Sequence, residues 1–148
     1  MADRSLLNSL AQITVIQAVQ RTQAQVMLEI ASRSHDDALS AAEHATIEAR
    51  DALGDWNHFL DRPLSFDYQR DLARRAITLE HDAERKRDIG AAAGDLFEQR
   101  RSAWQSTDAK VRMGQENLKR ARRRFARKCD ERDAHRTEAM TTWRWFGR

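Results

Sequence analysis

The sequence predicts an all-α protein, a long antiparallel two-helix coiled-coil hairpin with an overhanging C-terminal helix. Only five Gly and one Pro occur in 148 residues, too few for the turns of a many-stranded β fold. Charged residues make up 33% of the chain, and much of its apolar 41% is alanine, a composition typical of long solvated helices. Apolar residues also recur at helical spacing on both sides of the single proline. We expect one coiled-coil unit, residues 1–148, with helices over about 4–60 and 66–146 and a turn at 61–65.

The first helix is predicted from an apolar stripe with spacings near three and four residues. The stripe thins to alanines over residues 38–52 and ends with large side chains over residues 53–60. Small side chains in the middle allow two helix axes to approach closely, and the large ones at both ends clamp the pair. The first part of the stripe consists of Leu6, Leu7, Leu10, Ile13, Ile16, Val19, Val26, Met27 and Ile30.

The break between the helices is predicted at Pro63, because proline lacks the helical N–H and disfavours the α conformation in the residue before it. Ser65 can cap the next helix, and Asp67 brings negative charge to the positive end of its dipole. With a turn near residue 63, the numbers of facing residues should sum to about 126. That register brings Leu6 near Arg120 and leaves the chain beyond about residue 123 without a partner helix.

The second helix is predicted from alternating steps of four and three residues that begin at Leu72. Thirteen of the 22 positions in this frame are Ala or a larger apolar residue, and the frame needs no interruption. Apolar positions become rare after Phe125. We therefore expect the packed seam to end near Phe125 and the last twenty residues to be less well held.

A dense basic segment, here called the basic collar, follows the apolar frame. Residues 119–148 hold eleven basic and four acidic side chains, whereas residues 1–118 hold 15 basic and 19 acidic ones. The collar consists of Lys119, Arg120, Arg122, Arg123, Arg124, Arg127 and Lys128. These side chains surround a helix, which suits insertion into an acidic ring or socket. A merely solvated helix is an equally good interpretation, and nucleic-acid binding through phosphates is a weaker one, because no zipper follows the collar and no Asn lies within it.

The C-terminal residues Trp143, Arg144, Trp145 and Phe146 combine the residue types that anchor interfaces. They lie where no partner helix is predicted. Two interpretations stand beside each other: a cap that folds back on the hairpin, or anchors that enter a pocket of a partner protein. A membrane-surface contact is a minor third possibility.

The sequence offers no pattern for catalysis, a cofactor or a metal site. Its five histidines form no HExxH pattern, its single cysteine is Cys129, and no phosphate-binding glycine motif occurs. Paired acidic residues on a two-helix surface lack the cleft that catalytic carboxylates need. We expect no enzyme, no cofactor and no metal. No apolar run of 18 residues and no signal-peptide core are present, which favours a cytoplasmic protein without a transmembrane segment.

The layout resembles the FliJ/YscO family of type III secretion, flagellar or virulence. The resemblance covers almost the whole chain and rests on its length, the break at 61–65, and a long Arg-rich second helix that contains Trp104. It also rests on two segments, the opening Leu6-Leu7-Asn8-Ser9-Leu10 and the restart Phe66-Asp67-Tyr68-Gln69.

The resemblance implies a stalk function without catalysis. Family members are antiparallel hairpins whose paired terminal ends enter the pore of the hexameric export ATPase and promote its assembly and activity. Their middle region faces the export gate protein, and some members bind export chaperones. On this chain the ATPase-binding residues would be those of the basic collar, to which the interface chemistry adds Trp143 and Trp145. The gate-binding residues would be Leu72, Ala76, Leu79 and Ala83.

The expected location is therefore the cytoplasm, at the cytoplasmic face of the inner-membrane export apparatus. Two alternatives stay open. One is a coiled coil that binds nucleic acid through residues 119–128. The other is a coiled-coil scaffold that oligomerises.

Overall fold

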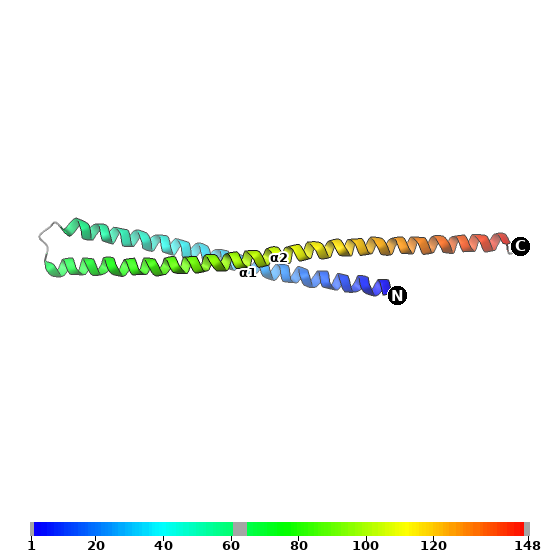
Figure 1. Ribbon diagram of the computed structural model, residues 1–148, viewed down its shortest axis with the longest axis horizontal. Helices are drawn as coiled ribbons and strands as arrows, with labels where there is room; N and C mark the ends of the chain where they lie inside the picture. The colour runs from blue at the N-terminus through cyan, green and yellow to red at the C-terminus, as the bar shows by residue number, and fades with distance from the viewer. Residues whose placement is uncertain (1, 61–64, 147–148) are drawn as a thin grey trace. The chain divides into compact units, whose positions relative to one another are not determined.

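The protein is an all-α helical hairpin, as predicted. A computed structural model describes residues 2–60 and 65–146, which form helices α1 (Ala2–Leu60) and α2 (Phe66–Phe146) with no strand among them (Figure 1). The helices begin and end within two residues of the predicted bounds. Most of the predicted turn, residues 61–64, lies outside the described residues.

Ser65 directly precedes the second helix, at the position predicted for its cap. Its carbonyl oxygen accepts hydrogen bonds from the N–H groups of Tyr68 and Gln69, at 3.1 and 3.2 Å. Asp67 lies in the first turn of α2, where its carboxylate faces the positive end of the helix dipole. The local sequence therefore fixes where α2 starts.

Two compact units can be distinguished along the hairpin. The terminal unit combines Met1–Gln23 with Gln105–Arg148, and the hairpin unit is Ala24–Trp104. The core of the hairpin unit is made of small side chains: Ala45, Ala49 and Ala83 are at most 2% exposed, and Leu79 packs against them. Alanine layers place the two helix axes close together, as the alanines over residues 38–52 predicted.

Two glycines of α2 extend this close approach. A Cβ atom on Gly90 would lie 3.8 Å from the backbone oxygen of Ala38, and one on Gly94 would lie 3.2 Å from Nε2 of His35. The His35 ring stacks on Phe97, with centroids 5.8 Å apart. A Cβ at Gly90 would make an ordinary van der Waals contact with the other helix, whereas one at Gly94 would press on the imidazole.

The predicted apolar stripe over residues 6–30 is only partly the seam, which is a correction. Its members from Ile13 to Ile30 are 46–59% exposed. The inward positions of α1 continue the frame of the alanines toward the N-terminus, where that frame meets polar residues. In this segment the inward residues are Leu7, Leu10, Thr14, Gln17, Arg21, Ala24 and Leu28.

The predicted register also needs correction. Ala38 lies beside Gly90, and Thr14 lies beside Gly114, so the numbers of facing residues sum to 128 rather than about 126. The reason is the phase of the two heptad frames. The inward positions of both helices coincide in layers only in this register, and a turn midpoint carries no information about that phase.

The seam of the terminal unit contains a buried charged cluster. Asp108 is 7% exposed, and its carboxylate contacts Arg21 Nε at 3.1 Å and an Arg112 guanidinium nitrogen at 2.7 Å. Val111, 1% exposed, lies one turn further along α2. The apolar seam of this unit is therefore interrupted by a polar layer.

The seam ends close to the predicted position. Phe125 and Cys129 are half-buried, and every described residue from Asp130 to Phe146 is exposed although the helix continues. The overhanging part of α2 therefore begins at about residue 130, a few residues later than the predicted position.

Candidate functional site

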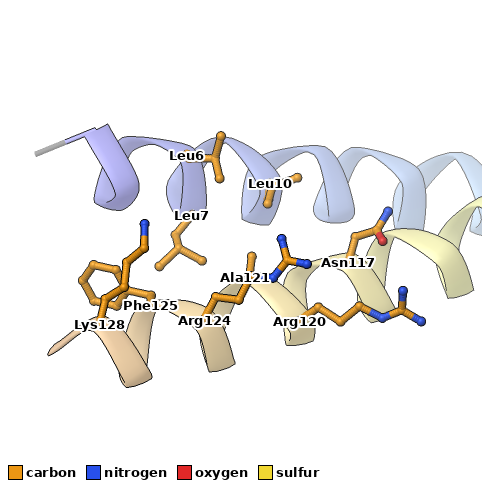
Figure 2. Close-up of a pocket in the computed structure, with 9 residues that line it drawn as sticks. All are labelled: Leu6, Leu7, Leu10, Asn117, Arg120, Ala121, Arg124, Phe125 and Lys128. Atoms are coloured by element: carbon orange, nitrogen blue, oxygen red, sulfur yellow. The ribbon is translucent and has the colours of Figure 1, made fainter. Parts of the chain in front are cut away.

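A groove of about 400 Å³ lies in the terminal unit, between the first turns of α1 and the part of α2 that carries the basic collar. Figure 2 shows Leu7 directed from α1 toward α2 and Lys128 directed from α2 toward α1. We call this feature the basic groove. Its lining residues are Leu6, Leu7, Leu10, Asn117, Arg120, Ala121, Arg124, Phe125 and Lys128.

The register of the two helices creates the basic groove. Leu7 is an inward position of α1, and the residue that faces it across the seam is Ala121, whose methyl group fills little of the space. Leu6 lies beside the inward position and is 58% exposed. Phe125 adds a half-buried aromatic ring. The groove therefore has an apolar floor that is open to the surface.

Three cations of the collar border this floor. Arg120, Arg124 and Lys128 are four residues apart, so they follow one face of α2. Arg120 contacts the Glu116 carboxylate at 3.2 Å, but both side chains are at least 65% exposed, so the pair is weak. Positive charge beside exposed leucine is complementary to a helix that presents both carboxylates and apolar side chains.

The rest of the collar, Lys119, Arg122, Arg123 and Arg127, is exposed on other faces of α2. Within residues 2–60 and 65–146, no ion pair engages Arg122, Arg123, Arg124 or Arg127. No ion pair among the described residues therefore neutralises their charge. An anionic partner that surrounds α2 would neutralise it.

The aromatic residues at the end of α2 do not fold back. Trp143, Trp145 and Phe146 are 77–87% exposed, and the helix continues through Phe146. The Thr142 hydroxyl donates to the Glu138 carbonyl oxygen at 2.6 Å, a bond within the same helix. Of the two interpretations of this segment, the cap is wrong, and the anchor interpretation stays a prediction.

The four predicted gate-binding residues lie in the seam of the hairpin unit. Ala76 and Ala83 are 2% and 0% exposed, and Leu72 and Leu79 are half-buried. A partner could reach Ala83, which has no exposed surface, only if the two helices separated there. Gate binding at these positions stays a prediction.

A second groove, which the sequence pattern alone does not mark, adjoins this stretch. It measures about 300 Å³ and its floor is apolar. The one sequence signal for it is Ile77, an apolar residue outside the inward frame that is 58% exposed. We call it the apolar groove. Its lining residues are Leu53, Trp56, Ala73, Ala76, Ile77, Glu80 and His81.

The described residues contain no group of three His, Cys, Asp or Glu side chains that could hold a metal ion. Over the same residues, neither helix has a segment long and apolar enough to cross a membrane. The candidate site is composed of cationic, aliphatic and aromatic side chains. Comparison with protein-family models, with curated proteins and with solved structures finds no match to this chain.

Proposed function

We propose that this chain is a non-enzymatic stalk and adaptor protein of a type III secretion export apparatus. In this proposal the terminal unit binds and stimulates the hexameric export ATPase, and the hairpin unit links that ATPase to the export gate protein. Export chaperones are further partners. The protein would act in the cytoplasm, peripherally at the inner-membrane export apparatus.

The observation that carries the proposal is that cations from Lys119 to Lys128 are exposed on every face of α2 except the one that packs on α1, where Ala121 and Phe125 lie. A helix that lies along a nucleic-acid groove or a flat protein surface uses one face and leaves the others in water. A helix inside a pore contacts protein on all sides. The collar covers the faces of α2 that α1 leaves exposed, and together with the exposed C-terminal helix after it this supports a pore of acidic character.

The basic groove supplies the second part of the proposed contact. Its leucine floor can bury apolar side chains of the ATPase while Arg120 and Arg124 pair with carboxylates. Burial of apolar area provides affinity, and the surrounding charges provide orientation and a fast encounter. The resemblance to the FliJ/YscO family, whose paired terminal ends have this role, supports the same assignment.

In the hairpin unit, we propose that the gate protein contacts the stretch of α2 that contains Leu72, Ala76, Leu79 and Ala83. Part of the exposed surface of this stretch is the apolar groove, which Ala76 lines but Leu72, Leu79 and Ala83 do not. A gate protein that inserts an apolar side chain there would leave the alanine seam intact. This is the form of the gate contact that we favour.

Stimulation of the export ATPase tests the proposal. Arg120→Glu with Arg124→Glu should weaken ATPase binding at least about tenfold, because two attractions become repulsions. The matched control is Arg74→Glu with Arg75→Glu, an equal charge change on an exposed part of α2 in the hairpin unit. Equal loss in both variants, or no loss in either, would show that the terminal unit is not the ATPase-binding surface.

A duplex DNA titration separates the nucleic-acid alternative. Nucleic-acid binding through the collar would give affinity at low salt that falls steeply as salt rises, because bound counterions are released. We expect no duplex binding at physiological salt. Tight binding there, abolished by the Arg120→Glu and Arg124→Glu pair, would replace the stalk proposal with the nucleic-acid one.

A further inference from the structure

Helix α1 carries a second apolar stripe on a side that does not face α2. It consists of aliphatic side chains that are 46–59% exposed. The inward residues of the same segment, among them Gln17, Arg21 and Ala24, lie on the neighbouring face of the helix, which packs on α2. We call this feature the outer stripe. Its members are Ile13, Ile16, Val19, Val26, Met27 and Ile30.

The outer stripe occupies the least charged part of the sequence. Between Gln12 and Ile30 the only charged residues are Arg21 and Glu29, although 33% of the chain is charged. Arg21 pairs with the buried Asp108, and Glu29 accepts a hydrogen bond from the Gln25 amide at 3.2 Å. An exposed face that is largely apolar and carries no charges of its own is typical of a surface that another protein covers.

Along the centre line of the stripe, apolar and polar residues follow one another in the same order in both directions. Its centre line follows alternating steps of three and four residues, the spacing of a heptad seam. Read from either end, the pattern is two apolar residues, two glutamines and two apolar residues. The centre line consists of Ile13, Ile16, Gln20, Gln23, Met27 and Ile30.

This symmetry makes the stripe complementary to itself in an antiparallel pair. Ile13 would pack on Ile30 of the second copy, and Ile16 would pack on Met27. Gln20 would meet Gln23, and two amides that face each other can both donate and accept hydrogen bonds. A shift by one heptad would bury glutamine against isoleucine or methionine without such a partner, so the polar layer fixes the register.

The flanking valines favour the antiparallel direction. In an antiparallel pair, Val19 of one copy would lie beside Val26 of the other, and both are about half exposed. In a parallel pair, the heptad position of Val19 would face Ala24 of the other copy. Ala24 is an inward residue of α1 and belongs to the seam with α2.

The size of the stripe suffices for a specific contact. Six half-exposed aliphatic side chains from each copy would bury on the order of 1,000 Å², close to the lower limit of stable specific interfaces. From the apolar face, the absence of charge and the self-complementary order, we propose that the outer stripe binds a second copy of this chain. The two α1 helices would be antiparallel, with the two-fold axis between Arg21 and Thr22. The inference is independent of the proposed export function.

Sedimentation equilibrium of the full chain tests the contact. We expect a dimer with a dissociation constant on the order of 10 µM. Ile16→Glu should weaken it at least about 100-fold, because the residue acts twice in a two-fold contact. The matched control is Val15→Glu, a neighbour outside the stripe that is 63% exposed and should change the constant less than about threefold. Far-ultraviolet circular dichroism should show equal helicity in all three proteins. A wild-type monomer at 100 µM, or equal weakening in both variants, would overturn the proposal.

Disulfide trapping tests the direction. On a Cys129→Ser background, one protein carries Ile13→Cys and a second carries Ile30→Cys. The two positions are 17 residues apart, about 25 Å along a helix. An antiparallel pair should cross-link only when the two proteins are mixed. Cross-links formed by either protein alone would indicate a parallel pair, and no cross-link in any sample would exclude this contact; both results contradict the proposal.

Discussion

The buried carboxylate of Asp108 should contribute more to stability than any exposed ion pair of the chain. It is 7% exposed and contacts Arg21 Nε at 3.1 Å and Arg112 at 2.7 Å. Asp108→Asn keeps the shape of the side chain and removes its charge. Hydrogen bonds to charged groups contribute about 1.5–3 kcal/mol when buried. Because the Arg21 and Arg112 side chains are 43% and 77% exposed and can be hydrated, we expect a loss of about 1–2 kcal/mol.

Urea denaturation followed by circular dichroism at 222 nm measures this loss. The matched control is Glu116→Gln, which removes an exposed pair with Arg120 on the same helix and should cost less than about 0.5 kcal/mol. A double-mutant cycle of Asp108→Asn with Arg21→Gln should give a coupling energy of about 1 kcal/mol. If Asp108→Asn costs no more than Glu116→Gln, or if the coupling is near zero, the polar layer does not stabilise the seam.

Three further changes test the packing and charge of the helices. Gly54→Ala should raise the free energy of unfolding by about 0.5–1 kcal/mol, because residue 54 lies in the interior of helix α1 and no atom would clash with the added Cβ. Lower stability in urea would contradict this. Ala83→Leu should lower it by about 1–3 kcal/mol because Ala83 has no exposed surface, whereas Ala91→Leu on an exposed face should be nearly neutral; similar costs would refute the close packing. The hydrogen bond from Lys86 lowers the pKa of Asp82, so Asp82 contributes stability above the ordinary aspartate pKa and loses that contribution as the pH falls through the lowered value. Asp82→Asn should therefore lower the melting temperature at pH 7 but not at pH 2, and an equal change at both would argue against this role.

Sequence alone predicted the fold class, the start of the second helix directly after Ser65 and, to within a few residues, the end of the seam near Phe125. These features follow from local chemistry and from a single periodicity. A heptad frame that begins at Leu72 marks the inward face of α2 without knowledge of the partner helix. Apart from Arg100, which is exposed, every position of that frame from Leu72 to Phe125 is at least half-buried in the structure.

The face of α1 that packs on α2, and the register between the two helices, could not be predicted in the same way. Between Ile13 and Ile30 two faces compete, and the more apolar one is the outer stripe, while Thr14, Gln17 and Arg21 face α2. Hydrophobicity favours the wrong face here because the seam is held in part by the charge of Asp108, a non-local partner. The signal that identifies the seam is the unbroken frame of the alanines over residues 38–52.

The candidate site was partly predictable for the same reason. The basic collar is a contiguous segment, so its residues were identified from composition alone. The basic groove needs Leu7 opposite Ala121, which depends on the register, and the apolar groove needs Trp56 beside Ile77, which depends on side-chain size at the seam. Only a structure that aligns the two helices brings such residues together.

Photo-cross-linking from the end of α2 tests the proposed stalk function most directly. With p-benzoylphenylalanine in place of Trp145, in the cells that make this protein, we expect an adduct with the subunit of a hexameric export ATPase. The same group in place of Ile47, an exposed residue of the hairpin unit, should give no such adduct. Adducts with nucleic acid, or the absence of any ATPase adduct from residue 145 while residue 47 yields one, would contradict docking through the terminal unit.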